Sequence, residues 1–179
     1  MLQSRNPAGP WTGLPIVLIG LMGVGKSTVG RRLAARLHVP FADADTEIER
    51  AAGMAVSEIF ARFGEPYFRD GERRVIARLV DGRPKVIATG GGAFLNEDTR
   101  RLILDQAITV WLDAHPKVLA ERVGRRDTRP LLRGRKPVEV LTELAAARNP
   151  IYALAPFRVT SQKAPHEATV AAIMEAIGA

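Results

Sequence analysis

One segment of the sequence combines glycines, a lysine and a hydroxyl in a spacing that can hold phosphate groups. Residues 20–27 read GLMGVGKS and fit the pattern G-x-x-x-x-G-K-[ST]. The glycines let successive backbone N–H groups point into one hollow, where the positive end of a following helix adds to the attraction for anions. Lys26 can supply a charge to the β- and γ-phosphates, and the Ser27 hydroxyl can complete a Mg²⁺ shell. The pattern predicts binding of a nucleoside triphosphate but does not say what happens to its terminal phosphate.

Two carboxylates, Asp43 and Asp45, follow a second short apolar segment, residues 41–43. An aspartate at this place often caps the next helix, and for an isolated pair that is the favoured interpretation. In the functional alternative, one carboxylate faces a metal and the other an acceptor hydroxyl, which suits phosphoryl transfer. The expected strand at residues 86–89 ends in glycines rather than in an aspartate, so Asp43 is the best remaining carboxylate for the metal shell, acting through water.

The glycines that follow that strand, Gly90, Gly91 and Gly92, have two interpretations. They can let the backbone approach a second ligand closely, because no side chain stands in the way. A loose connecting turn explains the same run equally well, and the sequence leaves both open.

Strands are expected to alternate with helices along the chain. Continuous apolar runs indicate strands, and apolar residues spaced three or four apart indicate helices. The expected strands are residues 16–19, 41–43, 86–89, 108–112 and 157–160. The expected helices follow the glycine loop and occupy residues 45–52, 56–63, 66–80, about 96–104, a segment from 116, 138–147 and the C-terminal segment. This alternation predicts an α/β domain with a mostly parallel sheet.

Composition narrows the possible partners. The 179 residues are 46% hydrophobic and 25% charged, which suits one globular domain with a real core. A net charge of +7 suggests an anionic partner without identifying its class. Aromatic residues make up only 6%, too few for a stacking platform that binds single-stranded nucleic acid. The absence of cysteine excludes disulfides, thiolate nucleophiles and cysteine metal sites.

Two segments differ from the rest. Residues 1–14 lack the continuous apolar middle of a signal peptide and predict a flexible N-terminal extension on a cytoplasmic protein. Residues 122–136 carry seven basic side chains and one acid, Asp127, which predicts a mobile surface segment. The longest apolar stretch, residues 16–25, is too short to span a bilayer.

Taken in order, six motifs resemble the shikimate kinase family: GLMGVGKST, FADAD, EIFARFGEPYFR, ATGGG, TRPLL and ARNPIY. The resemblance runs from about Ile16 to the C-terminus, and the combination is far more specific than the phosphate motif by itself. It implies a three-layer P-loop kinase fold of the nucleoside-monophosphate-kinase type, with a five-stranded parallel sheet flanked by helices. It also implies a kinase domain at residues 15–179 with a mobile lid at about residues 122–137.

The resemblance further implies that the chain transfers the γ-phosphate of ATP to the 3-hydroxyl of shikimate, on the route to chorismate and the aromatic amino acids. The implied ATP-binding residues are Gly23, Val24, Gly25, Lys26, Ser27, Thr28 and Arg129. The implied shikimate-binding residues are Asp45, Arg69, Gly91 and Arg148. One Mg²⁺ ion would be held by Ser27 and, through water, by Asp43. Lys26, Asp45 and Arg129 would be the catalytic residues.

The chemistry of these side chains agrees with the implied roles. The planar guanidinium groups of Arg69 and Arg148 suit a bidentate pair with the shikimate carboxylate. Asp45 can orient the attacking hydroxyl, and whether it also acts as a base stays open, since phosphoryl transfer depends mainly on positioning and charge neutralisation. A closing lid would exclude water and bring Arg129 to the transferred phosphate.

Other interpretations remain. Arg69 and Arg148 could be ordinary solvated arginines. A related kinase acting on gluconate would also need arginine and aspartate, although the spacing of the motifs favours shikimate. A nucleotide-dependent protein that binds nucleic acid is disfavoured, because the basic residues concentrate in one short segment. The expected partners are therefore shikimate and ATP, without nucleic acid or membrane, for a protein that acts as a monomer.

Overall fold

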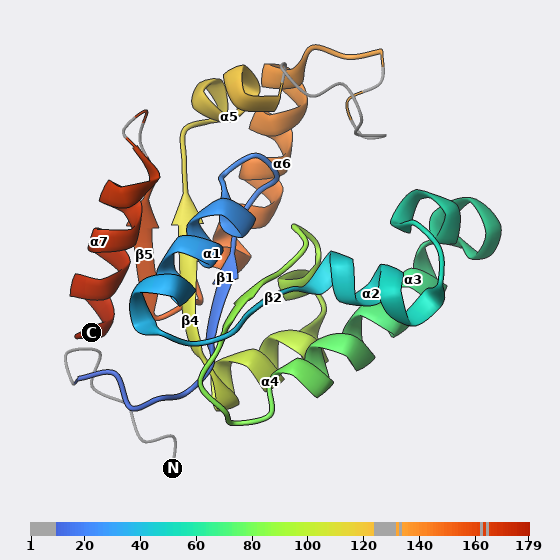
Figure 1. Cartoon of the computed structure of the whole chain (residues 1–179). Coiled ribbons are helices and arrows are strands. Elements are labelled where there is room, and N and C mark those ends of the chain that lie inside the picture. Colours follow the sequence, from blue (N-terminus) through green and yellow to red (C-terminus); the bar gives the residue numbers. More distant parts are fainter. Residues whose placement is uncertain (1–9, 124–131, 133, 162, 164) are drawn as a thin grey trace.

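A five-stranded parallel sheet forms the centre of the molecule (Figure 1). The computed structural model describes residues 10–123, 132, 134–161, 163 and 165–179. The strand order is β2-β3-β1-β4-β5, and every pairing between neighbouring strands is parallel. The strands are β1 (Ile16–Ile19), β2 (Phe41–Asp43), β3 (Val86–Ala88), β4 (Ile108–Asp113) and β5 (Phe157–Thr160). The predicted five-stranded parallel sheet is confirmed.

Helices connect the strands and cover the sheet. They are α1 (Lys26–Leu37), α2 (Ala44–Ala52), α3 (Val56–Leu79), α4 (Glu97–Gln106), α5 (Pro116–Val123), α6 (Pro137–Tyr152) and α7 (His166–Ile177), with a short 3₁₀ helix η1 (Ala93–Leu95) after β3. The alternation of strand and helix follows the sequence pattern, and the predicted three-layer fold is confirmed.

The core explains why helices must lie on both faces of the sheet. All four residues of β1 are buried, and successive side chains of a strand point to opposite faces. The covering side chains come from several helices, among them Leu33 of α1, Ile103 of α4, Leu141 of α6 and Ile173 of α7. Each fully buried side chain of this kind contributes about 1.5–3 kcal/mol through the hydrophobic effect.

Two helices differ from their predicted bounds in a way that matters for the site. The segments predicted as separate helices at residues 56–63 and 66–80 form the single element α3, which is interrupted at Gly64 (φ 80°, ψ 174°). Pro66 then begins the second half. The N–H groups in the first turn of a helix have no partner within the helix, so proline costs no hydrogen bond there. Helix α6 does not end at residue 147 but continues to Tyr152, with Pro150 inside its last turn. Arg148 and Tyr152 are therefore one helical turn apart.

The N-terminal segment contacts the domain from Trp11 onward. The backbone N–H of Trp11 donates to the Gly178 carbonyl oxygen (3.2 Å), and its indole Nε1 donates to the Leu14 carbonyl oxygen (3.0 Å). Residues 1–9, the rest of the predicted extension, lie outside the described residues. Among the described helices, none has both the length and the apolar composition that a bilayer span requires.

Candidate active site

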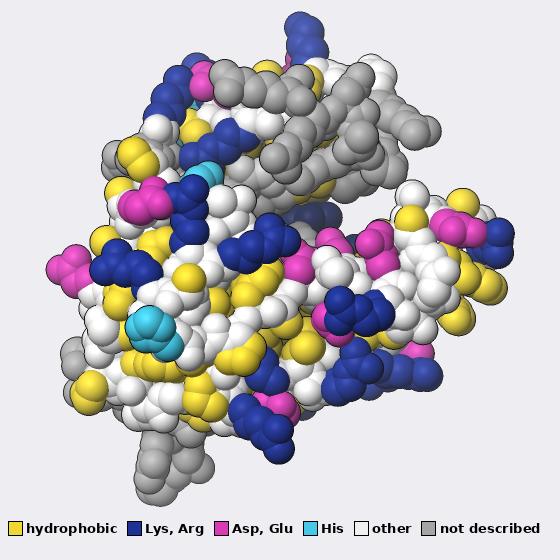
Figure 2. Space-filling view, in the orientation of Figure 1, with side chains coloured by type: hydrophobic (Ala, Val, Ile, Leu, Met, Phe, Trp, Pro, Cys, Tyr) yellow, Lys and Arg dark blue, Asp and Glu magenta, His cyan; other side chains and the backbone are white. Residues whose placement is uncertain are grey.

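The carboxyl ends of β1, β2 and β3 meet at one edge of the sheet, because the three strands are parallel and adjacent. Loops at this edge line a cleft of about 760 Å³. Val56 and Phe60, from the first half of α3 (residues 56–63), line one side of the cleft. This half of α3 and α2 together form an arm beside the main body (Figure 1). Figure 2 shows basic and acidic side chains together in the hollow between this arm and the main body. This edge is where open α/β sheets bind their ligands.

The glycine loop leaves β1 and enters α1 at the cleft. Gly23 (φ 80°) and Gly25 (φ 98°) adopt positive φ angles that glycine tolerates at no steric cost. The ammonium group of Lys26 is buried beneath the loop, where its Nζ donates to the carbonyl oxygens of Gly20 (2.6 Å) and Leu21 (2.9 Å). These bonds hold the loop in shape, with a positive charge and the N-terminus of α1 facing the cleft.

Asp43 caps α2, as the favoured interpretation of the sequence predicted, and it also contacts the phosphate loop through Ser27. Its Oδ1 accepts hydrogen bonds from the backbone N–H groups of Asp45 (3.0 Å) and Thr46 (3.2 Å), which caps α2. Its Oδ2 accepts a hydrogen bond from the Ser27 hydroxyl (2.5 Å). One carboxylate therefore joins the start of α2 to the start of α1.

The Ser27–Asp43 pair is chemically suited to Mg²⁺. Both donors are oxygens, and they meet at the cleft beside the phosphate loop. Among the described residues, no group of three or more His, Asp or Glu side chains could enclose a metal by itself. A hydroxyl and a carboxylate that share an ion with bound phosphates are a usual arrangement for Mg²⁺.

Asp45 lies two residues further on and lines the same cleft. Burial raises the pKa of its carboxyl, and the nearby Asp43 carboxylate raises the pKa further. The positive charges of Lys26 and Arg69 oppose the rise without cancelling it. Asp45 is therefore a carboxylate in an environment that disfavours its charge, which is typical of a reactive site.

The three glycines after β3 are surrounded by charged side chains. A β-carbon added to Gly90 would lie 3.1 Å from Asp45 Oδ1 and 3.3 Å from Glu72 Oε2. One added to Gly91 would lie 3.2 Å from Arg148 Nη1, and one added to Gly92 would lie 2.6 Å from Arg69 Cζ. Glycine is needed here because the neighbouring functional side chains already occupy the space.

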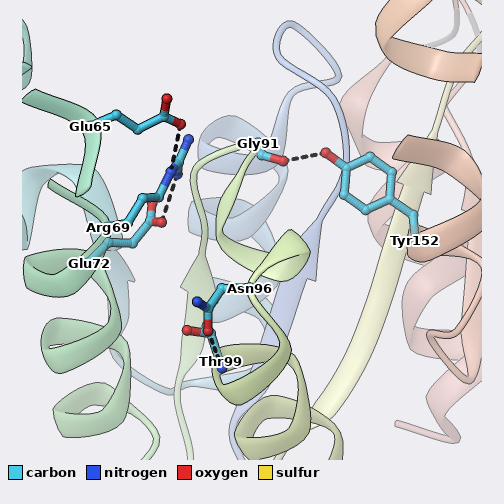
Figure 3. Close-up of polar contacts among 7 residues, drawn as sticks. All are labelled: Glu65, Arg69, Glu72, Gly91, Asn96, Thr99 and Tyr152. Atoms are coloured by element: carbon cyan, nitrogen blue, oxygen red, sulfur yellow. Dashed lines mark hydrogen bonds and ion pairs between the residues drawn. The ribbon is translucent and has the colours of Figure 1, made fainter. Parts of the chain in front are cut away.

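Arg69 reaches the triple glycine from the second half of α3. Its Nη1 donates to Glu72 Oε1 (2.8 Å) and its Nε to Glu65 Oε1 (3.3 Å), as Figure 3 shows. Glu72 is almost fully buried, and burial raises the pKa of its carboxyl despite the hydrogen bond from Arg69. Its other oxygen, Oε2, has no hydrogen-bond partner among the described residues and faces Gly90. Glu72 lines the cleft and was not predicted, although its i,i+3 spacing from Arg69 could have indicated the pair.

Arg148 and Tyr152 approach the triple glycine from α6, whereas Arg69 approaches it from α3. The Tyr152 hydroxyl donates to the carbonyl oxygen of Gly91 (Figure 3). Arg148 lines the cleft, while Tyr152 is fully buried behind it. Tyr152 is the last residue of the ARNPIY motif, and the sequence assigned it no role.

The cleft brings together most of the predicted site residues. Those that line it are Gly23, Gly25, Lys26, Ser27, Thr28, Asp43, Asp45, Arg69, Gly91 and Arg148. Val24 is fully buried, and its carbonyl oxygen accepts a hydrogen bond from Arg122 Nη1 (3.2 Å). Arg129 and most of the predicted lid lie outside the described residues. The cleft also contains residues that the sequence did not single out, namely Val56, Phe60, Phe68, Glu72 and Thr89.

Comparison with known sequences finds one family. Residues 22–178 match the family model described as shikimate kinase. A shikimate kinase from Caulobacter vibrioides is 60% identical over 168 residues, which cover 94% of this chain and 84% of the relative. A shikimate kinase from Zymomonas mobilis subsp. mobilis is 54% identical over 177 residues, which cover 99% of both chains.

Solved structures agree with the sequence relatives. A shikimate kinase from Acinetobacter baumannii in complex with shikimate has a TM-score of 0.88 and 35% identity, and the match covers 93% of each chain. A gluconokinase from Sinorhizobium meliloti 1021 has a TM-score of 0.57 at 21% identity over 92% of this chain and 90% of the neighbour. The second likeness shows a shared fold only.

Proposed function

The chain belongs to the shikimate kinase family, and from this premise we propose that it transfers the γ-phosphate of ATP to the 3-hydroxyl of shikimate. The products are shikimate 3-phosphate and ADP. As a member of this family the chain is an ATP-dependent phosphotransferase. The assignment of individual residues to the two substrates rests on the geometry of the cleft.

The observation that carries the proposal is the arrangement of charges around the triple glycine. Arg69 and Arg148 come from different helices, α3 and α6, and their guanidinium groups lie against neighbouring glycines in one loop. Two guanidinium groups that meet at one loop can hold one carboxylate by charge-assisted hydrogen bonds. Shikimate carries a carboxylate and ring hydroxyls, so this arrangement supports it as the acceptor.

The donor half of the site is the phosphate loop. Backbone N–H groups of residues 23–28 and the N-terminus of α1 would hold the ATP phosphates, and Lys26 would turn its ammonium group from the loop carbonyls toward the β- and γ-phosphates. Ser27 and, through water, Asp43 would hold one Mg²⁺ ion, which supplies charge neutralisation at the phosphates when it is bound.

Asp45 would orient the acceptor hydroxyl toward the terminal phosphorus. Its raised pKa makes proton uptake easier than for an exposed aspartate, which is compatible with taking the hydroxyl proton. Orientation is the role that we assign to it first, since the transition state of phosphoryl transfer is loose and needs little deprotonation beforehand.

The remaining assignments rest on the resemblance of the motifs to the family. We propose that residues 122–137 close over the bound nucleotide and that Arg129 then reaches the transferred phosphate. We also propose that the enzyme acts as a cytoplasmic monomer and needs no nucleic acid or membrane.

Release of ADP tests the proposed function. The purified protein is assayed with ATP and Mg²⁺ in the presence of shikimate, of gluconate, or of no acceptor, and ADP is followed through a coupled reaction. We expect ADP formation that depends on shikimate, with gluconate at the level of the blank. If ADP formed with gluconate and not with shikimate, gluconate would be the acceptor and the proposed function would be wrong.

Replacement of Gly92 by alanine tests the contact between Arg69 and the acceptor. The backbone of Gly92 (φ −96°, ψ −10°) suits alanine, so the substitution adds no backbone strain. The new β-carbon would displace the Arg69 guanidinium, whose Cζ would lie 2.6 Å from it. We expect the KM for shikimate to rise about tenfold while the KM for ATP stays constant, because a charge-assisted contact is lost at the acceptor alone.

Gly71→Ala provides the matched control. Gly71 lies in α3 and a β-carbon there would meet no atom within 4 Å. This variant should keep both KM values and gain slightly in stability, because alanine favours the helix. A KM for shikimate that stays at the wild-type value in Gly92→Ala would exclude the assigned position of Arg69.

A further inference from the structure

We propose that Tyr152 is a positioning residue for the acceptor, because its hydroxyl fixes the peptide between Gly91 and Gly92 in the direction that binding requires. The inference rests on the proposed function and concerns a residue behind the cleft rather than one lining it. It assigns a role to the hydroxyl of a side chain that cannot touch either substrate directly.

The hydrogen bond from Tyr152 joins two parts of the chain that are far apart in sequence. The tyrosine ends α6, and Gly91 lies 61 residues earlier in the loop after β3. The ring is completely buried, and it packs at a tilt against the Trp111 ring with the centroids 6.1 Å apart. A buried ring has little freedom to move, so its hydroxyl is a fixed point for the loop.

The direction of one peptide group follows from this bond. A peptide unit is planar and trans, so the Gly91 C=O and the Gly92 N–H point in opposite directions. The carbonyl points toward Tyr152 on the α6 side of the loop (Figure 3). The Gly92 N–H is therefore directed to the other side, where Arg69 lies against Gly92. That is where the carboxylate of the acceptor would accept a hydrogen bond.

Arg148 is held within the same group of contacts. It lies one helical turn before Tyr152, and its Nη1 would be 3.2 Å from a β-carbon at Gly91. Burial raises the pKa of the Tyr152 hydroxyl, while the Arg148 charge acts in the opposite direction. The hydroxyl thus stays protonated and remains a donor at neutral pH. Tyr152 therefore contacts the loop that supplies the Gly92 N–H, and it also lies beside Arg148, which supplies a positive charge.

The test is Tyr152→Phe, which removes one oxygen atom and keeps the ring. Without the hydroxyl, the Gly91 carbonyl loses its partner and the peptide can rotate. We expect the KM for shikimate to rise about tenfold with a smaller fall in kcat, because a buried hydrogen bond is lost at the acceptor side. The KM for ATP should remain unchanged, since the Tyr152 hydroxyl bonds to the loop after β3 rather than to the phosphate loop.

Two controls separate positioning from general destabilisation. Tyr67→Phe removes a hydroxyl from an exposed tyrosine in the second half of α3, whose ring stacks on Phe63, and it should leave all kinetic constants unchanged. Ile103→Val removes a methyl group from a side chain of α4 that is fully buried in the core. It should lower the melting temperature without raising the KM for shikimate relative to that for ATP.

The outcomes separate the inference from the function on which it rests. A selective rise in the KM for shikimate in Tyr152→Phe, absent from both controls, supports the positioning role. Equal changes in the two KM values, or none in either, overturn it and leave the proposed function standing if the wild-type enzyme phosphorylates shikimate. A wild-type enzyme that releases no ADP with shikimate removes the function itself.

Discussion

Asp45→Asn is expected to lower kcat about 10³-fold, because the carboxylate that orients the acceptor hydroxyl and can accept its proton is lost. The amide keeps the size of the carboxylate but loses the charge that orients the acceptor hydroxyl. ATP affinity should be retained, because Asp45 is not part of the phosphate loop. Steady-state kinetics with shikimate and equilibrium binding of ATP measure the two effects separately.

The same substitution should stabilise the protein. Burial raises the folded-state pKa of Asp45 above its unfolded value, so the folded state binds this proton more tightly than the unfolded state. The free energy of unfolding therefore falls as pH rises from the unfolded pKa to the folded pKa, and the loss persists at neutral pH. The amide of the variant carries no such charge, so the variant should melt at a higher temperature than wild type at pH 8. The difference should shrink as the pH falls toward 4.

Asp105→Asn is the matched control for both measurements. Asp105 is exposed on α4, away from the cleft. This variant should keep wild-type kcat and should not melt at a higher temperature than wild type at pH 8. Turnover of Asp45→Asn within a few-fold of wild type would remove Asp45 from the catalytic residues.

Arg148→Met is expected to lower kcat/KM for shikimate about 10³-fold, because two charge-assisted hydrogen bonds to the acceptor are lost together. Methionine keeps an unbranched side chain on α6 but has no donor for a carboxylate. The loss should appear mainly in the KM for shikimate, with the KM for ATP unchanged. Initial rates over a matrix of both substrate concentrations give the two constants.

Arg101→Met controls for the loss of an arginine charge. Arg101 is exposed on α4 and pairs only at the surface with Glu97 (2.9 Å) in the described contacts. Surface pairs of this kind contribute little, so neither activity nor stability should change measurably. If Arg148→Met behaved like this control, the acceptor carboxylate would have to bind elsewhere.

The strands and the phosphate loop could be predicted because their signals are local. A continuous apolar run such as residues 16–19 is buried on both faces, and the glycines that follow it have no other reason to be spaced as they are. The end of α6 could not be predicted in the same way. Pro150 signals a helix end locally, but buried packing of Tyr152 at the core extends the helix past it.

Asp43 shows that one carboxylate can cap a helix and contact a second element at the same time. Its two oxygens point to different partners, one to the N–H groups that start α2 and the other to Ser27. The sequence shows the residue type but not the direction of each oxygen.

Glu72 and Tyr152 were missed for a different reason. Each acts through a contact with another part of the site, Arg69 for the first and Gly91 for the second. The contact between Tyr152 and Gly91 exists only once β3 and α6 are packed together, and no spacing in the sequence records it. In our proposal this long-range contact orients the peptide group that binds the acceptor.

A crystal structure of the enzyme with shikimate and a non-reacting ATP analogue tests the central claim most directly. We predict that the ring carboxylate lies between the guanidinium groups of Arg69 and Arg148, with the 3-hydroxyl at Asp45 and in line with the terminal phosphorus. A carboxylate bound away from both arginines, or a ring turned so that another hydroxyl faces the phosphate, would contradict the account.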